Sequence, residues 1–136
     1  MKTITLYRPV GLTELRLIKE LRWQAFPPRL AWQPIFYPVL NEAYAAQIAR
    51  EWNTNDEFSS YLGAVTKFNV AAAFIEQYEV QNVGANEHDE LWIPSENLQK
   101  FNSAIIVKIE VVNAFFGCNF RMPGDEMLTS VLNKFL

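Results

Sequence analysis

Cysteine and histidine are almost missing from this 136-residue chain, in which Cys118 and His88 are the only examples of each. One cysteine cannot form a disulfide within the chain, and one cysteine with one histidine cannot complete a structural zinc site. We therefore expect no disulfide and no metal. A reducing compartment fits this composition.

Basic residues are scarce and scattered, with 12 Lys and Arg against 15 Asp and Glu and a formal net charge of −3. Without a basic patch, a nucleic-acid partner is not expected. No apolar run reaches the roughly 20 residues that a membrane-spanning helix needs, and Arg8 interrupts the start before a secretory signal could develop. These absences predict a cytoplasmic protein with no membrane partner.

Apolar residues, by contrast, make up half of the chain, and ten Phe, five Tyr and four Trp are among them. Such a chain can bury a core. Alternating apolar residues predict strands over 3–8, 35–37, 61–70, 79–83, 90–93 and 105–112, and helical spacing predicts helices over 12–21, 42–52, 71–77, 95–101 and 125–135. Strands and helices are mixed without regular βαβ spacing, which favours an α+β fold.

Several details of this fold can be predicted as well. Pro9 lacks an N–H, so the first strand should end on Arg8, and Asn41 should cap the helix that follows it. The segment 105–112 has the strongest strand character and is predicted to be the central strand. The aromatic segment 22–33 is predicted to be an ordered loop. Residues 1–116 should form the domain, and 117–136 a helical extension that docks on the domain or on a partner.

Few residues are candidates for chemistry. His88 and Cys118 lie in different segments and no Gly-x-Ser-x-Gly motif is present, so triad hydrolysis is not expected. Asp89 and Glu90 are adjacent on a strand and point to opposite faces, so only one can enter a given site. What remains is a cation, an aromatic and a carboxylate at strand ends: Arg8, Tyr37 and Glu90. Because clefts open at strand ends, we expect these three side chains to meet in one cleft. Each alone also suits an ordinary structural role.

The order of three motifs resembles the ADP-ribosyltransferase-like fold, a mixed or antiparallel sheet with short helices. The motifs are Leu6-Tyr7-Arg8, then Phe36-Tyr37 followed by Asn41-Glu42-Ala43-Tyr44-Ala45, then His88-Asp89-Glu90-Leu91-Trp92-Ile93-Pro94. The segments 6–11, 25–41 and 90–115 are similar to a family of short bacterial proteins labelled "ADP-ribosylation/crystallin J1".

This resemblance implies a small-molecule ligand, NAD, as substrate. Glu90 would be catalytic and would stabilise the positive charge that develops on the ribose as nicotinamide departs. Arg8 would hold phosphate, Tyr37 would stack on nicotinamide, and His88 would belong to the same NAD-binding set. Many protein-modifying members have Glu or Gln at the position of His88, and no Ser-Thr-Ser motif is present, so the acceptor stays unknown.

Two alternatives from other classes stay open. One is a catalytically silent module that binds a ligand or a protein through Trp23, Phe26, Arg29 and Trp32, residue types that anchor interfaces. The same residues could instead pack a loop on the core. The other alternative is an inert homo-oligomeric or regulatory subunit whose C-terminal helix makes the contact.

Overall fold

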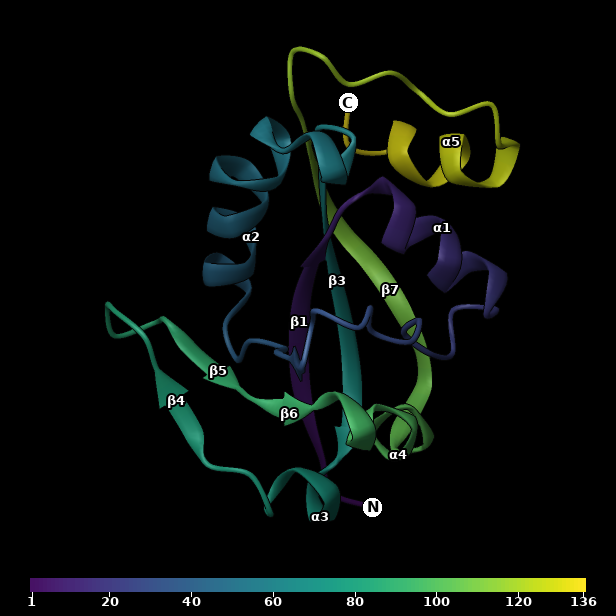
Figure 1. Ribbon diagram of the computed structural model, residues 1–136. Coiled ribbons are helices and arrows are strands. Elements are labelled where there is room, and N and C mark those ends of the chain that lie inside the picture. Colours follow the sequence, from purple (N-terminus) through teal and green to yellow (C-terminus); the bar gives the residue numbers. More distant parts are fainter.

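The computed structural model describes all residues from 1 to 136 and is built around a three-stranded antiparallel sheet (Figure 1). Its strands, in the order β1-β3-β7, are β1 (Thr3–Val10), β3 (Leu62–Ala71) and β7 (Ile105–Phe116). The prediction that 105–112 is central is therefore wrong, because β3 occupies the centre and β7 an edge. Burial explains the order: β3 is buried along most of its length, whereas Lys108 and Glu110 of β7 are exposed.

Strand β1 also continues past the predicted end at Arg8 and includes Pro9 and Val10. Tyr7 exchanges both of its backbone hydrogen bonds with Val39, at 2.9 and 2.8 Å, on the side of β1 away from β3. Backbone groups alternate along a strand, so Pro9 also turns its nitrogen away from β3. The missing N–H therefore costs no hydrogen bond to β3, which is why the proline is tolerated there.

Two short antiparallel pairs extend this arrangement. Strand β2 (Ile35–Phe36) pairs with β6 (Ile93–Pro94), and β4 (Val80–Asn82) pairs with β5 (Asp89–Leu91). Val39 links them to the main sheet, because it forms one bridge with Tyr7 and another with Glu90. The predicted α+β class is confirmed, with antiparallel sheets and short helices.

Short helices cover both faces of the sheet (Figure 1). They are α1 (Leu12–Glu20), α2 (Glu42–Glu51), α3 (Ala72–Ile75), α4 (Leu98–Ser103) and α5 (Glu126–Asn133), with single 3₁₀ turns at Asn53–Asn55, Glu57–Ser59 and Ser95–Asn97. Helix α2 packs on one face and forms a small core with Val39 and Val65, whereas α1, α4 and α5 contribute to a larger core on the other face.

Four phenylalanines from distant segments meet in the larger core. They are Phe26, Phe36, Phe68 and Phe101, with ring centres 4.9 to 6.0 Å apart. Each is almost fully buried, which contributes about 1.5–3 kcal/mol per side chain. The Asn102 side chain hydrogen-bonds both the N–H and the carbonyl of Phe26, so the segment 22–33 is held on the body at this residue.

The C-terminal segment packs on the same core. Leu128 and Leu132 of α5 are fully buried, and Lys19 of α1 forms an ion pair with Asp125, which also caps α5 by accepting a hydrogen bond from the Leu128 N–H. Figure 1 shows α5 beside α1 at the same end of the molecule. None of the helices has the length and apolar character that crossing a membrane would require.

Candidate functional site

The bridge through Val39 decides where the Glu90 side chain points. Residues paired directly across strands have side chains on the same face, so Tyr7, Val39 and Glu90 share one face of the sheet. That face is the one covered by α2, since Val39 packs with Tyr44, Ala45 and Ala49 of that helix. Glu90 therefore lies in the angle between the sheet edge and α2.

The Glu90 carboxylate is buried, with 8% of the residue exposed, and both of its oxygens accept hydrogen bonds. The Tyr44 hydroxyl donates to Oε2 at 2.6 Å, and the Trp92 indole N–H donates to Oε1 at 2.9 Å. Two aromatic side chains thus hold the carboxylate in one orientation. No Lys or Arg pairs with it, so its negative charge is not neutralised within the protein.

Tyr44 owes its position to the start of α2. Asn41 caps this helix as predicted, because its side chain accepts a hydrogen bond from the Tyr44 N–H at 3.2 Å. Burial, together with the hydrogen bond to Glu90 and that residue's negative charge, raises the pKa of the Tyr44 hydroxyl. The phenol therefore stays protonated and continues to donate to Glu90 at neutral pH.

His88 supports this arrangement from behind Tyr44. The two rings stack with centres 4.3 Å apart and planes 22° apart. The Ala85 N–H donates to Nδ1, so Nδ1 is the acceptor and Nε2 carries the proton, which it donates to Gln47 Oε1 at 3.0 Å. Both ring nitrogens are thus engaged within the protein. His88 stacks on Tyr44, which lines the groove, but His88 itself does not line it.

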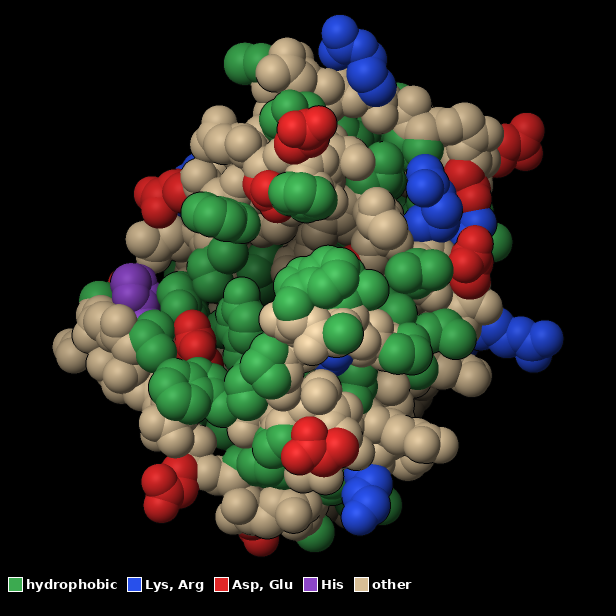
Figure 2. Space-filling model, viewed as in Figure 1, with side chains coloured by type: hydrophobic (Ala, Val, Ile, Leu, Met, Phe, Trp, Pro, Cys, Tyr) green, Lys and Arg blue, Asp and Glu red, His purple; other side chains and the backbone are tan.

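A groove with a volume of about 420 Å³ opens beside Glu90. Four of its lining residues follow one side of α2 at helical spacing, and the others come from the sheet edge and the end of the helix: Tyr44, Gln47, Ile48, Glu51, Tyr37, Glu90 and Trp52. The lining thus holds three aromatic rings and two carboxylates but no cation. Figure 2 shows hydrophobic side chains gathered across the middle of one face of the molecule, with Lys and Arg mainly toward its margin.

Arg8 points away from this groove. It neighbours Tyr7 on the strand, so its side chain emerges on the opposite face from Glu90. There it is buried, with 6% of the residue exposed, and forms a bidentate ion pair with Glu14 through Nε at 2.7 Å and Nη2 at 3.0 Å. Burial by itself lowers the pKa of Arg8, but the Glu14 carboxylate outweighs that effect and raises it. The expectation that Arg8, Tyr37 and Glu90 meet in one cleft is therefore corrected.

Tyr37 is the residue that lies between the two faces. It lines the groove together with Glu90, and its ring centre is 5.6 Å from the guanidinium carbon of Arg8. The chain reaches this place because Phe36 belongs to β2 whereas Val39 pairs with β1, so Tyr37 sits at the transition between the two sheets. Tyr37 and Glu90 line the groove together, whereas Arg8 lies beside Tyr37 and does not line it.

The residues that sequence reasoning missed include Trp92, which holds Glu90 without lining the groove, and the groove residues Tyr44, Gln47 and Glu51. Trp92 could have been found, because it lies two residues after Glu90 in an extended segment and so points to the same side. Tyr44 and Gln47 had weaker signals, since the apolar face that stands out over 42–52 consists of Ala45, Ile48, Ala49 and Trp52. Of that face only Ile48 and Trp52 line the groove. No group of three or more His, Cys, Asp or Glu side chains is placed to hold a metal ion.

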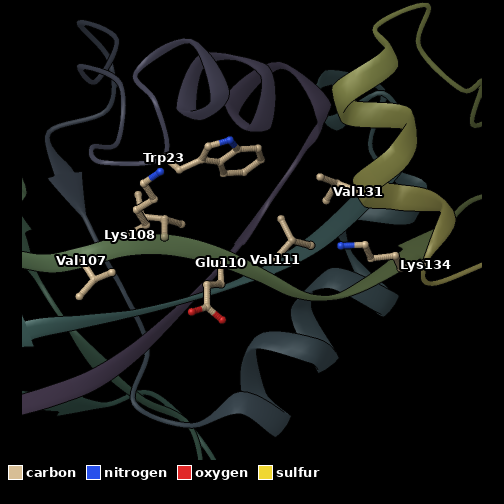
Figure 3. Close-up of a pocket in the computed structure, with 8 residues that line it drawn as sticks. Trp23, Val107, Lys108, Glu110, Val111, Val131 and Lys134 are labelled. Carbon is tan, nitrogen blue, oxygen red and sulfur yellow. The ribbon is translucent and has the colours of Figure 1, made fainter.

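A second hollow, of about 450 Å³, lies beside the outer edge of β7 (Figure 3). Trp23, Val111 and Val131 point into it, and Glu110 points to the other side of the strand. The Ile109 N–H donates to the Trp23 carbonyl at 2.7 Å, so the loop covers part of this strand edge. Trp23, named above for the alternative of a silent binding module, lines this hollow, whereas Arg8, Tyr37, His88 and Glu90 do not.

The chain matches no family model, and no curated protein and no solved structure is detectably similar to it.

Proposed function

We propose that the groove between α2 and the β5 edge binds a flat, positively charged ring attached to a sugar, and that this group is the nicotinamide riboside end of NAD. The observation that carries the proposal is the Glu90 carboxylate, which is buried, fixed by Tyr44 and Trp92, and without a counter-cation. A buried charge of this kind is stabilised by a cation. The aromatic walls add cation–π attraction.

The same carboxylate suits cleavage of the bond to nicotinamide. When the bond between C1′ of the ribose and the ring nitrogen breaks, both electrons go to the nitrogen, and nicotinamide leaves as a neutral molecule. The ribose becomes oxocarbenium-like, and a fixed carboxylate beside it lowers the energy of that transition state. Water or an acceptor then supplies the electron pair for the new bond to C1′ and releases its proton to solvent. The proposal thus describes an ADP-ribosyltransferase-like protein whose acceptor is unknown.

A catalytically silent binding module is the second candidate, and one observation favours it. Both oxygens of Glu90 already accept hydrogen bonds from the protein. In the same way, Nε and Nη2 of Arg8 already donate to Glu14. A carboxylate oxygen can accept a second bond, so these contacts do not block a ligand. They do suit a site that recognises positive charge without reacting with it.

Titration with nicotinamide riboside and with NAD, followed by an assay for released nicotinamide, tests the proposal in wild type and Glu90→Gln. The amide keeps the shape and one acceptor for Trp92 but removes the charge. Binding of the cationic ring should weaken, and any cleavage should fall by roughly a hundredfold or more, the scale for loss of one transition-state electrostatic contact. Glu42→Gln, which removes an exposed charge from the same helix outside the groove lining, is the matched control and should change cleavage little.

The melting temperature separates this role from a structural one. Because the partner of Arg8 is Glu14, neutralising Glu90 leaves no buried cation unpaired, and the melt should barely shift. If wild type bound neither compound at millimolar concentration and Glu90→Gln were strongly destabilised, Glu90 would be a structural residue and the proposal would fail. Binding without cleavage would select the silent module.

A further inference from the structure

Arg29 is a cation that the protein itself leaves unsatisfied. It lies in the segment between α1 and β2, is half-buried, and its Nε is buried with no hydrogen-bond partner. The ion pairs of the molecule join Arg8 to Glu14 and Lys19 to Asp125, so neither of them includes Arg29. A buried guanidinium nitrogen without an acceptor is costly, and such groups call for an explanation.

The charges around Arg29 add to the cost of its missing hydrogen-bond acceptor. Its guanidinium carbon lies 5.9 Å from the centre of the Phe36 ring, and that of Arg8 lies 4.7 Å from the same centre. Burial first, and then the nearby positive charge of Arg8, lower the pKa of Arg29, whereas Glu14 acts in the opposite direction. Glu14 acts on both guanidinium groups through its charge, but its hydrogen bonds go to Arg8. The cluster carries an excess positive charge that an anion would neutralise.

We propose that Arg29 is the anion-binding residue of this protein and that it takes a phosphate or diphosphate group of the ligand whose cationic end lies beside Glu90. Tyr37 connects the two positions, since its ring lines the groove and also lies beside Arg8. The guanidinium of Arg29 presents a planar fork that suits two phosphate oxygens. Arg8, held by Glu14, adds positive charge from behind but has no free fork for the ligand.

This inference rests on the proposed function and sharpens its substrate class. A ligand with a positive ring at one end and phosphate at the other matches both the acidic groove and the Arg29 cluster. We assign the phosphate to Arg29 in place of Arg8, because Glu14 occupies Nε and Nη2 of Arg8 whereas the buried Nε of Arg29 has no acceptor.

Three probes separate the two parts of the site. Inorganic pyrophosphate carries only the anion, nicotinamide riboside only the cationic ring, and NAD both. We would measure the binding of each probe by calorimetry in wild type, Arg29→Gln, Arg29→Lys and the control Arg16→Gln, which removes an exposed arginine from α1. Arg29→Gln should weaken pyrophosphate and NAD by about tenfold or more, the scale of one charge-assisted hydrogen bond, and leave nicotinamide riboside unchanged. Arg29→Lys should retain part of the affinity.

The unliganded melt guards against a purely structural effect. Removing one of two neighbouring cations relieves repulsion, so Arg29→Gln should melt at the same temperature as wild type or higher. If wild type and Arg29→Gln bound pyrophosphate equally, Arg29 would not be the anion site, and nicotinamide riboside binding would still leave the proposed function standing. If pyrophosphate binding depended on Arg29 while nicotinamide riboside did not bind at all, the anion site would stand and the proposed function would fail.

Discussion

The ion pair between Arg8 and Glu14 offers the sharpest test of the structural reasoning. Replacing Glu14 by Gln keeps the shape of the side chain but removes the negative charge, and the amide group turns a donor toward a guanidinium that needs acceptors. Arg8 would then be a buried cation with another cation, Arg29, as its neighbour. We expect Glu14→Gln to destabilise the protein strongly.

The magnitude follows from burial. Breaking a buried ion pair by removing one partner costs about 3–5 kcal/mol. The Glu14 side chain is 22% exposed and water can reach it, so the cost should lie near the lower limit, about 3 kcal/mol. A domain of this size loses roughly 3–5 °C of melting temperature per kcal/mol, so the melt should fall by roughly 10–15 °C.

The assay is thermal and urea unfolding of purified wild type, Glu14→Gln and Glu20→Gln. Glu20 is an exposed residue at the end of the same helix, where an anion is unfavourable, so the control should be neutral or slightly stabilising. The double variant Arg8→Met with Glu14→Leu should recover much of the lost stability, because it removes the unpaired charge. A free energy of unfolding for Glu14→Gln within about 0.5 kcal/mol of wild type would show that the buried Arg8 does not depend on Glu14.

Three further predictions concern other contacts. A Cβ at Gly63 would collide with the backbone of α2, so Gly63→Ala should cost about 1–3 kcal/mol, whereas Gly124→Ala, with open space around it, should not; equal melts would contradict this packing. The hydrogen bond from Lys19 lowers the pKa of Asp125, so the ionised Asp125 stabilises the folded protein. This contribution is present above about pH 4 and is lost as the pH falls through the lowered pKa. Asp125→Asn should therefore flatten the acid side of a plot of Tm against pH. The pKa of Tyr44 is raised in the folded protein, so above about pH 10 unfolding releases the phenol proton and the stability of the fold falls as the pH rises. Tyr44→Phe should lessen this alkaline loss of stability. An unchanged alkaline slope of Tm would show that the Tyr44 phenol does not cause the loss.

Local chemistry made much of the fold predictable. The cap at Asn41, the apolar faces of α1 and α5, and the alternation in β3 are each set by residues close together in the chain. Such patterns report which face of an element is apolar. They do not report which strands are neighbours, and for that reason the strongest strand pattern, over 105–112, was assigned to the centre of a sheet in which it is an edge.

The candidate site shows the same division. The sequence identified Glu90 and Tyr37 as residues for one cleft, and both line the groove. It could not show that Arg8 faces the other way, because that depends on Tyr7, and not Arg8, pairing through Val39 with Glu90; a shift of one residue would reverse every side chain. Nor could it show that Glu14, after the turn into α1, occupies the fork of Arg8 and leaves Arg29 without an acceptor. The sequence alone therefore determined the secondary structure and the apolar face of each element, because these depend on residues close together in the chain. Strand register and long-range packing depend on the whole chain at once, and they decided which charges meet.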